Sequence, residues 1–215
     1  WGQSISGVMI ALLAPVLGAI ADGSGKRMVW IWIFSVLYVV GSWGIWYLVP
    51  GEPDLFHAML WFGLGLIGME FATIFTNSLM PDLTVDEDMG KMSGAGFAFG
   101  YLGGIIALMI MLLFFNENGA TGKTLIGIKP LLGLDPATRE GTRAVGPITA
   151  IWYIVFMIPF FAWVKEPKGP GRRVNIGQSM AELWTLIKSL KQRRSLGAHL
   201  LSSMFYRDAL NALYG

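Results

Sequence analysis

The sequence contains no cysteine and few charged residues, and both shortages narrow what the protein can be. Without cysteine, the chain of 215 residues forms no disulfide and no zinc or iron–sulfur site built on thiolates. Asp, Glu, Lys and Arg make up only 14% of the residues, whereas a soluble domain carries about 25%. Hydrophobic residues make up 54%. The charges are too few to cover a water-facing surface of this size, which favours a membrane protein.

The sequence motifs of common enzymes and cofactor sites are missing as well. Neither His57 nor His199 has a second ligand at metal-binding spacing. The tripeptide Gly122-Lys123-Thr124 matches the end of a phosphate loop, but no glycine stands five positions before Gly122. No nucleophile–base pair is evident. We therefore expect no enzyme activity, no metal, no cofactor and no direct use of ATP. The basic residues sit where membrane topology needs them, which argues against nucleic-acid binding.

Long apolar runs occupy most of the chain. A membrane-spanning helix needs about 20 predominantly apolar residues. The predicted spans are Ile5–Ala21, Met28–Val49, Leu55–Met80, Ser93–Phe115 and Val145–Val164, and a sixth begins near Leu196. Pro15 interrupts the first run, but proline is tolerated in a span when neighbouring groups satisfy the freed carbonyl. The predicted fold class is all-α, a polytopic transmembrane helix bundle.

Positive charge is concentrated in one connection between spans, residues 165–195. Its basic residues are Lys165, Lys168, Arg172, Arg173, Lys188, Lys191, Arg193 and Arg194. The positive-inside rule places this segment in the cytoplasm. Strict alternation then puts Asp22–Arg27 and Pro81–Met92 inside, and Pro50–Asp54 and Asn116–Ala144 outside. The N-terminus would emerge outside, so we expect at least one earlier span and read the chain as part of a longer protein.

Part of the basic segment has helical periodicity. Its apolar residues fall on one helical face: Ile176, Met180, Leu183, Trp184, Ile187 and Leu190. Ser179 and Glu182 have the spacing of a capping box. We predict a short amphipathic helix that either lies on the membrane surface or packs under the bundle. In the outer connection, Asp135-Pro136 predicts the start of a helix, with Asp as N-cap and Pro at the first helical position.

The junction between the first two spans reads GAIADGSGKR over residues 18–27. It resembles the major facilitator superfamily, in which the loop between spans two and three reads roughly Gly-x-x-x-Asp-x-x-Gly followed by two basic residues. Asp22, Gly25, Lys26 and Arg27 occupy the matching positions, and Gly23 stands where that family often has a basic residue. The resemblance implies a gating motif in which Asp22 helps to lock the outward-facing state. The alternative is an ordinary helix cap with basic anchors.

Later stretches resemble the vacuole-effluxer branch of this superfamily, which contains autophagy-related amino-acid effluxers and many bacterial relatives. They cover Phe75–Leu83, Met89–Gly94, Gly96–Gly104, Arg143–Pro167 and Phe205–Asp208. The branch often has Asn where Arg207 stands. The resemblance implies a partial major facilitator fold with about spans two to seven of twelve. Residues 1–165 would be five spans of the N-terminal half, 166–195 the cytoplasmic inter-domain loop, and 196–215 the start of the C-terminal half.

Charged and amide side chains inside the predicted spans are the candidate site. A charge at the bilayer centre costs at least about 2.5–3.5 kcal/mol on insertion scales, so such residues should face the bundle interior. Glu70 and Asn77 lie in the third span, and Arg207, Asp208 and Asn211 lie in the last. In an effluxer of zwitterions, an acid would receive the substrate ammonium group and a base its carboxylate; either acid could instead carry a coupling proton. The alternative is a static ion pair of Arg207 with Glu70 or Asp208.

Gly96, Gly100 and Gly104 repeat at four-residue spacing in the fourth span. Small residues at this spacing let two helices approach closely. We predict a helix-packing role for these glycines, with a role specific to transport as the alternative.

Together with the resemblance, these features predict a secondary active transporter that works by alternating access. We expect it to export amino acids or similar small metabolites across a bacterial inner (plasma) membrane. Its expected partners are the small-molecule substrate, a coupling proton or sodium ion, and membrane lipid. A cation-coupled sugar symporter of the same superfamily and a non-transporting membrane scaffold are the alternatives.

Overall fold

The computed structural model describes residues 2–24, 26–51, 54–166, 176–190 and 192–214. Within the helices, the side chains of residues 2–5, 19, 22–24, 176, 179–180, 182–183, 186 and 207–214 are outside the described set. The described residues form helices and connecting turns, with no strand among them.

Long helices form where the apolar runs predict them. They are α1 (Gly2–Ser24), α2 (Arg27–Gly44), α3 (Leu55–Ser78), α5 (Met89–Ile110), α7 (Val145–Trp163) and α9 (Arg194–Tyr214). Four helical segments are long and apolar enough to cross a membrane: Arg27–Tyr47, Leu55–Leu83, Asp86–Phe115 and Glu140–Trp163. The described apolar part of α1, Ser6–Gly18, is shorter, although α1 continues through Pro15. The predicted all-α polytopic bundle is confirmed.

Shorter helices join the long ones. They are η1 (Ile45–Tyr47), α4 (Met80–Leu83), η2 (Asp86–Asp88), the π-helix η3 (Met111–Phe115), η4 (Leu131–Gly133), α6 (Glu140–Arg143) and the expected amphipathic helix α8 (Ile176–Ser189). Because α8 begins at Ile176, Ser179 lies inside the helix, and the predicted capping box is wrong.

The predicted helix start at Asp135-Pro136 is also wrong. Asp135 Oδ1 accepts a hydrogen bond from the backbone N–H of Ala137 at 2.9 Å, which closes a turn instead. Arg139 then adopts a left-handed conformation with φ of 56°, and helix α6 begins only at Glu140.

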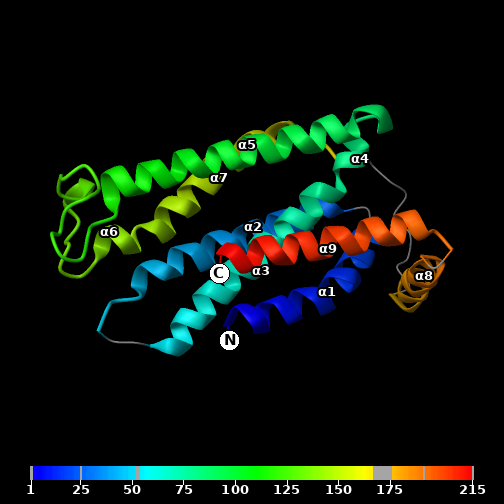
Figure 1. Cartoon of the computed structure of the whole chain (residues 1–215), viewed down its shortest axis with the longest axis horizontal. Coiled ribbons are helices and arrows are strands. Elements are labelled where there is room, and N and C mark those ends of the chain that lie inside the picture. The colour runs from blue at the N-terminus through cyan, green and yellow to red at the C-terminus, as the bar shows by residue number, and fades with distance from the viewer. Residues whose placement is uncertain (1, 25, 52–53, 167–175, 191, 215) are drawn as a thin grey trace.

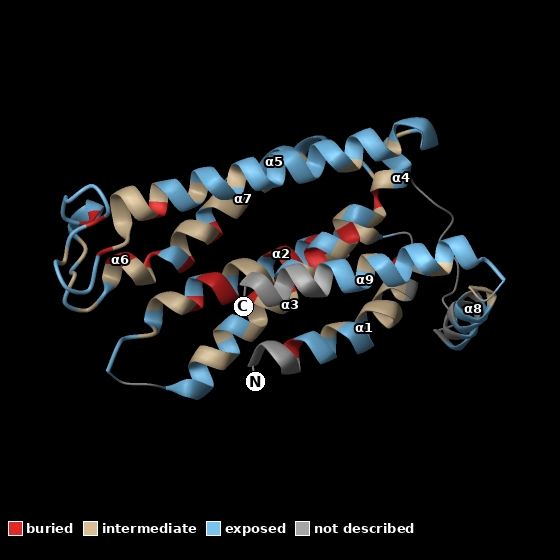
Figure 2. Cartoon of the chain, in the orientation of Figure 1, coloured by how far each residue is buried: buried red, intermediate tan, exposed pale blue. Residues whose placement is uncertain are grey.

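The core lies where α2 packs on α3 (Figure 2). Phe34, Phe71 and Phe75 stack there with ring centroids 4.7 to 6.3 Å apart. Two glycines let the helices approach this closely. A Cβ at Gly41 would collide with the backbone of α3, and one at Gly68 would collide with the backbone of α2.

The helices form an elongated bundle in which α1 and α2 flank α3, and α7 packs on α2 (Figure 1). The α1–α2 junction, the acidic turn η2 between α4 and α5, and the end of α7 lie at one end of the bundle. We call it the inner end, because the basic segment that follows α7 is expected in the cytoplasm. Helix α5 runs along one edge of the bundle, and none of its residues is buried (Figures 1 and 2).

Helix α3 starts at the outer end with a side-chain cap. Asp54 Oδ1 accepts a hydrogen bond from the backbone N–H of His57 at 3.1 Å, and Oδ2 lies 2.5 Å from His57 Nδ1. The backbone hydrogen bond, followed by the one from the imidazole, lowers the pKa of Asp54 below its usual value. The cap sets the point at which the chain enters the predicted span.

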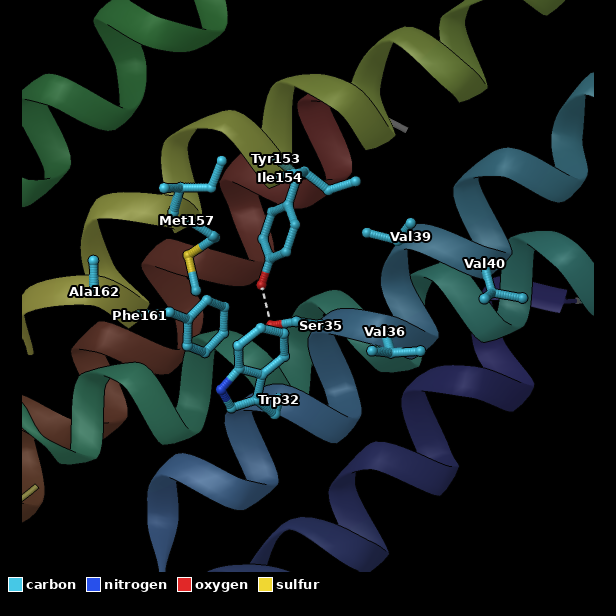
Figure 3. Close-up of a pocket in the computed structure, with 11 residues that line it drawn as sticks. Trp32, Ser35, Val36, Val39, Val40, Tyr153, Ile154, Met157, Phe161 and Ala162 are labelled. Carbon is cyan, nitrogen blue, oxygen red and sulfur yellow. Dashed lines mark hydrogen bonds between the residues drawn. The ribbon is translucent and has the colours of Figure 1, made fainter.

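Helices α2 and α7 are joined near their midpoints by a hydroxyl pair. The hydroxyl oxygens of Ser35 and Tyr153 lie 2.7 Å apart (Figure 3). The ring of Tyr38 stands edge-on to Tyr153, with the ring centroids 4.7 Å apart. Beside this pair, the two helices enclose an apolar groove of about 560 Å³.

Candidate functional site

Three polar side chains in the inner half of α3 share one face of this mainly apolar helix, which we call its polar face. Glu70, Thr73 and Asn77 are spaced i, i+3 and i+7, which places them on the same helical face. Glu70 is partly buried and Asn77 is exposed. The buried residues of α3 lie on the opposite face: Gly65, Gly68, Phe71, Ala72 and Phe75. Packing therefore occupies one side of the helix and leaves the polar side free of the core.

The polar face borders a groove of about 710 Å³ between the inner half of α3 and the beginning of α5. Thr73 and Asn77 line it from α3. Residues of α5 that line it include Ser93, Gly96, Gly100 and Tyr101. Glu70 lies one turn beyond Thr73 on the same face, farther from the inner end. Asn77 of the third span and two glycines of the fourth, Gly96 and Gly100, were predicted for separate reasons and line one groove.

The polar groups of Thr73 and Glu70 differ in whether they have a hydrogen-bond partner within the protein. Thr73 Oγ1 donates a hydrogen bond to the Met69 carbonyl at 2.8 Å, along its own helix. Within the described part of the chain, no hydrogen bond or ion pair reaches the carboxylate of Glu70. Among the described residues, the Glu70 carboxylate thus has no protein partner.

The α5 glycines have open space beside them. A Cβ at Gly96, Gly100 or Gly104 would meet no atom within 4 Å. No described helix packs against this face, so their predicted packing role stays a prediction. Close approach through glycines occurs elsewhere, for example at Gly41 and Gly68 between α2 and α3 and at Gly146 of α7 against the backbone of Ser42 in α2.

Arg27 is the centre of a polar joint at the inner end. Its guanidinium donates hydrogen bonds to the Ser78 carbonyl at 2.6 Å and to Asp82 Oδ2 at 2.6 Å, and its Nε lies 3.5 Å from Glu166 Oε1. The Glu166 carboxylate also accepts the backbone N–H groups of Arg27 at 2.7 Å and Met28 at 3.1 Å. An acid from the end of α7 therefore caps the N-terminus of α2, where the helix dipole favours negative charge.

This joint ties together the inner ends of α2, α3, α4 and α7. Of the four residues of the predicted gating motif, Arg27 takes part and Lys26 is exposed. Gly25 and the side chain of Asp22 lie outside the described residues. The Arg27 partners Ser78, Asp82 and Glu166 were not predicted from the sequence. Two of these partners could have been suspected from their positions. Asp82 and Glu166 follow the predicted third and fifth spans closely, at the inner end where the basic motif also lies.

Helix α9 carries the remaining predicted site residues, Arg207, Asp208 and Asn211. Its backbone is helical over these positions, but their side chains lie outside the described residues. The pairing of Arg207 with Glu70 or Asp208 therefore stays a prediction.

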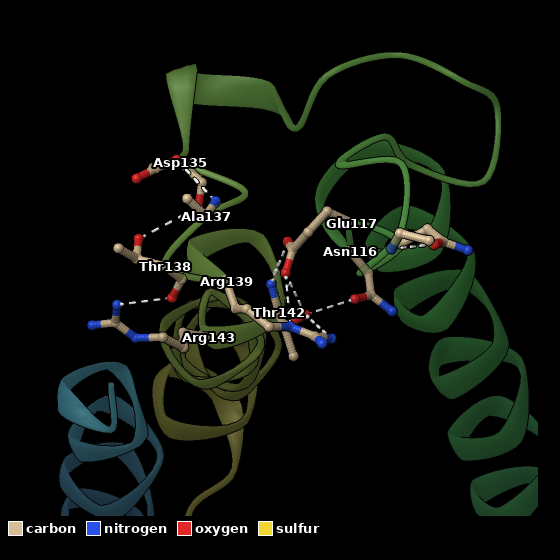
Figure 4. Close-up of polar contacts among 10 residues, drawn as sticks. Asn116, Glu117, Asp135, Ala137, Thr138, Arg139, Thr142 and Arg143 are labelled. Atoms are coloured by element: carbon tan, nitrogen blue, oxygen red, sulfur yellow. Dashed lines mark hydrogen bonds and ion pairs between the residues drawn. The ribbon is translucent and has the colours of Figure 1, made fainter. Parts of the chain in front are cut away.

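At the outer end, Glu117 is a buried carboxylate that the sequence did not indicate. Its side chain is 1% exposed and accepts hydrogen bonds from the backbone N–H of Thr142 at 3.0 Å and from Thr142 Oγ1 at 2.8 Å (Figure 4). Arg139 Nε lies 3.3 Å away. A Cβ at Gly141 would collide with Glu117, so a glycine is needed there. Glu117 thus fixes the connection after α5 to the start of α6.

Arg143 extends this outer network to α2. Its guanidinium donates two hydrogen bonds to the Trp46 carbonyl and lies 5.0 Å from the centre of the Trp46 ring. The outer ends of α2, α5 and α7 are therefore held by one connected set of polar contacts. Among the described residues, no group of three His, Asp or Glu side chains could hold a metal ion.

The sequence of this chain is similar to two bacterial proteins and matches one family profile. The "Uncharacterized MFS-type transporter YxiO" of Bacillus subtilis (strain 168) is 27% identical over 218 residues, covering 98% of this chain and 46% of that protein. An "Uncharacterized protein" of Aquifex aeolicus (strain VF5) is 38% identical over 99 residues, 46% of this chain and 25% of that protein. This chain spans less than half the length of either relative, and no solved structure matches. The family profile described as "Vacuole effluxer Atg22 like" matches residues 1–215, and the chain belongs to that family.

Proposed function

We propose that the protein is a secondary transporter of the major facilitator type whose substrate path runs along the polar face of α3 and the groove it shares with α5. Family membership and the relative named as an MFS-type transporter support the reaction class. The position of the substrate path is inferred from one observation. Glu70, Thr73 and Asn77 lie on the face of α3 opposite its buried residues, in a segment apolar enough to span the membrane. Polar groups are costly at hydrocarbon depth and are functional by default.

The chemistry of this face fits a small zwitterion such as an amino acid. The carboxylate of Glu70 binds the substrate ammonium group, and the amide of Asn77 supplies neutral hydrogen bonds. Arg207 of α9 is the proposed base for the substrate carboxylate. The absence of side chains at Gly96 and Gly100 leaves room for a substrate between the helices. Glu70 would alternatively carry a coupling proton.

The inner joint keeps the N-terminal half together in this proposal. Arg27 contacts Ser78, Asp82 and Glu166 and so joins the inner ends of α2, α3, α4 and α7, which all belong to that half. With these ends held, the half would move as one body when the two halves of the protein rock around the midplane site, and gating by Asp22, Gly25, Lys26 and Arg27 stays the role that the resemblance implies. Residues 1–165 then belong to the N-terminal half, 166–195 to the inter-domain loop, and 196–215 to the start of the C-terminal half. Export across the bacterial plasma membrane is part of the proposal.

Counterflow in proteoliposomes tests this function. The full-length protein is loaded with unlabelled amino acids, and uptake of a labelled amino-acid mixture is measured for wild type, Glu70→Gln and Glu87→Gln. Glu87 is an exposed acid of the η2 turn and controls for loss of one charge.

We expect exchange in wild type and Glu87→Gln and its loss in Glu70→Gln. Equal exchange in all three proteins would overturn the role of Glu70. No exchange of amino acids in wild type, with sodium-dependent uptake of sugars instead, would overturn the substrate class and favour the sugar-symporter alternative.

A further inference from the structure

The groove between α2 and α7 has no part in the proposed substrate path. Its walls are almost entirely apolar and come from these two helices alone (Figure 3). We propose that it holds one acyl chain of an anionic phospholipid from the inner leaflet, whose phosphate is bound by Lys26 and Lys165.

The groove begins in the inner half of the membrane and reaches past its middle. It is lined from Trp32 to Val40 on α2, and at 1.5 Å per residue these positions lie about 8 to 20 Å from the start of α2 at Arg27. The hydrocarbon core is about 30 Å thick, so the groove lies mostly in the half nearer the inner end. Both helices belong to segments apolar enough to cross a membrane.

The walls require an apolar occupant. Val36 is 55% exposed and Ile158 is 59% exposed, although both line a hollow. The hydroxyl groups of Ser35 and Tyr153 bond to each other at 2.7 Å, so one of their two O–H groups donates to a partner within the wall itself. At the inner end, Trp32 and Phe161 stack with centroids 3.9 Å apart. A volume of about 560 Å³ is within the range of small-molecule sites.

Two positively charged residues, Lys26 and Lys165, lie at the inner end of the groove, where the headgroup of an inner-leaflet lipid would be. Arg27 and Glu166 bring the inner ends of α2 and α7 together, and Lys26 and Lys165 are their immediate neighbours in the chain. The acids of this joint, Asp82 and Glu166, are engaged with Arg27. Both lysines are exposed, and neither ammonium group is in an ion pair within the described residues. Lysines at this boundary attract the anionic lipids of the cytoplasmic leaflet.

Native mass spectrometry of the full-length protein, released from micelles that contain phosphatidylglycerol and phosphatidylethanolamine with the same chains, tests the site. We expect wild type to retain phosphatidylglycerol. Val36→Trp and Ile158→Trp fill the groove and should lower lipid occupancy about tenfold. The matched control, Leu102→Trp, adds the same ring at an exposed position of α5 outside both grooves and should retain the lipid.

The headgroup is tested by a double variant, Lys26→Gln with Lys165→Gln. We expect its preference for phosphatidylglycerol over phosphatidylethanolamine to fall about tenfold. Lys91→Gln, an exposed lysine at the same end that is paired with Asp88, is the control and should keep the preference. An unchanged preference in the double variant would overturn the role of the two lysines.

Three results would overturn the groove as a lipid site. They are full lipid retention in both groove-filling variants, equal lipid loss in Leu102→Trp, and a lipid-free dimer that Val36→Trp dissociates, which would make the groove a protein interface. If the Trp variants fail to fold, a photoactivatable acyl phosphatidylglycerol is crosslinked to wild type. Adducts on α2 and α7 support the proposal, and adducts confined to other helices contradict it.

Discussion

Arg27 illustrates how one side chain links helices that are distant in sequence. Its side chain is 20% exposed and contacts Ser78, Asp82 and Glu166, which lie 51, 55 and 139 residues further along the chain. A guanidinium can bond several acceptors in different directions at once, which a lysine ammonium at the same position would not reproduce.

We therefore predict that Arg27→Lys destabilises the protein by about 2 kcal/mol, the usual worth of hydrogen bonds to a charged group. Thermal unfolding followed by tryptophan fluorescence in detergent measures this. The neighbouring Lys26→Ala is the control and should melt like wild type. Equal melting temperatures for Arg27→Lys and wild type would show that the joint contributes no stability.

The buried carboxylate of Glu117 allows a second prediction about the stability contributed by one side chain. Glu117→Gln keeps the shape of the side chain but removes its charge, and one amide oxygen must then replace two carboxylate oxygens facing Thr142 and Arg139. We predict a loss of about 1–3 kcal/mol, because a buried hydrogen-bond network becomes incompletely satisfied. The melting temperature is compared with that of Lys123→Ala, an exposed position of the same loop. A melting temperature equal to that of the control would contradict the structural role of Glu117.

The sequence predicts some of these residues and misses others for physical reasons. Glu70 and Asn77 stand out because a carboxylate and an amide are rare at hydrocarbon depth. Thr73 and Tyr101 give no such signal, because neutral hydroxyl groups are tolerated in spans. The i, i+3 and i+7 spacing from Glu70 could have found Thr73. The burial of Glu117 depends on how a long connection folds back on α6, which local sequence does not reveal.

At the scale of elements, helix positions are predictable and helix contacts are not. A hydrocarbon layer requires continuous apolar runs, so α2 (Arg27–Gly44) and α7 (Val145–Trp163) match their predicted spans closely. The glycine spacing in α5 suggested close packing there. The structure instead places glycine-mediated close contact at Gly41 and Gly68, because contact depends on which faces meet in three dimensions.

This packing gives a prediction for the α2–α3 pair. Gly68→Ala places a methyl group against the backbone of Tyr38, which cannot move like a side chain, so the helices must separate. We expect a loss of about 1–3 kcal/mol from overpacking. Gly94→Ala on α5 is the matched control, since its Cβ meets nothing within 4 Å and alanine favours the helix. If Gly68→Ala melts at or above the temperature of Gly94→Ala, the close contact between α2 and α3 is wrong.

At the scale of the whole molecule, charge distribution predicts the orientation in the membrane. The basic segment from Lys165 onward is expected in the cytoplasm, which puts Glu87 inside and Thr121 outside. Because the chain has no cysteine, single-cysteine variants report each side without interference from native thiols of this segment. On intact cells, an impermeant maleimide should label Thr121→Cys and spare Glu87→Cys, and both should react after permeabilisation. The reverse pattern would invert the topology.

We propose that the polar face of α3 and the facing side of α5 line a water-filled path. Thr73→Cys places a thiol in the groove, and Ala95→Cys places one at similar depth on the opposite side of α5. The most direct measurement is the labelling rate of these two thiols by a charged, water-soluble reagent in the full-length protein, with any other cysteine replaced. We expect rapid labelling of Thr73→Cys, slowed by substrate, and no labelling of Ala95→Cys in lipid. Equal labelling of both positions, or protection of Thr73→Cys without substrate, would contradict it.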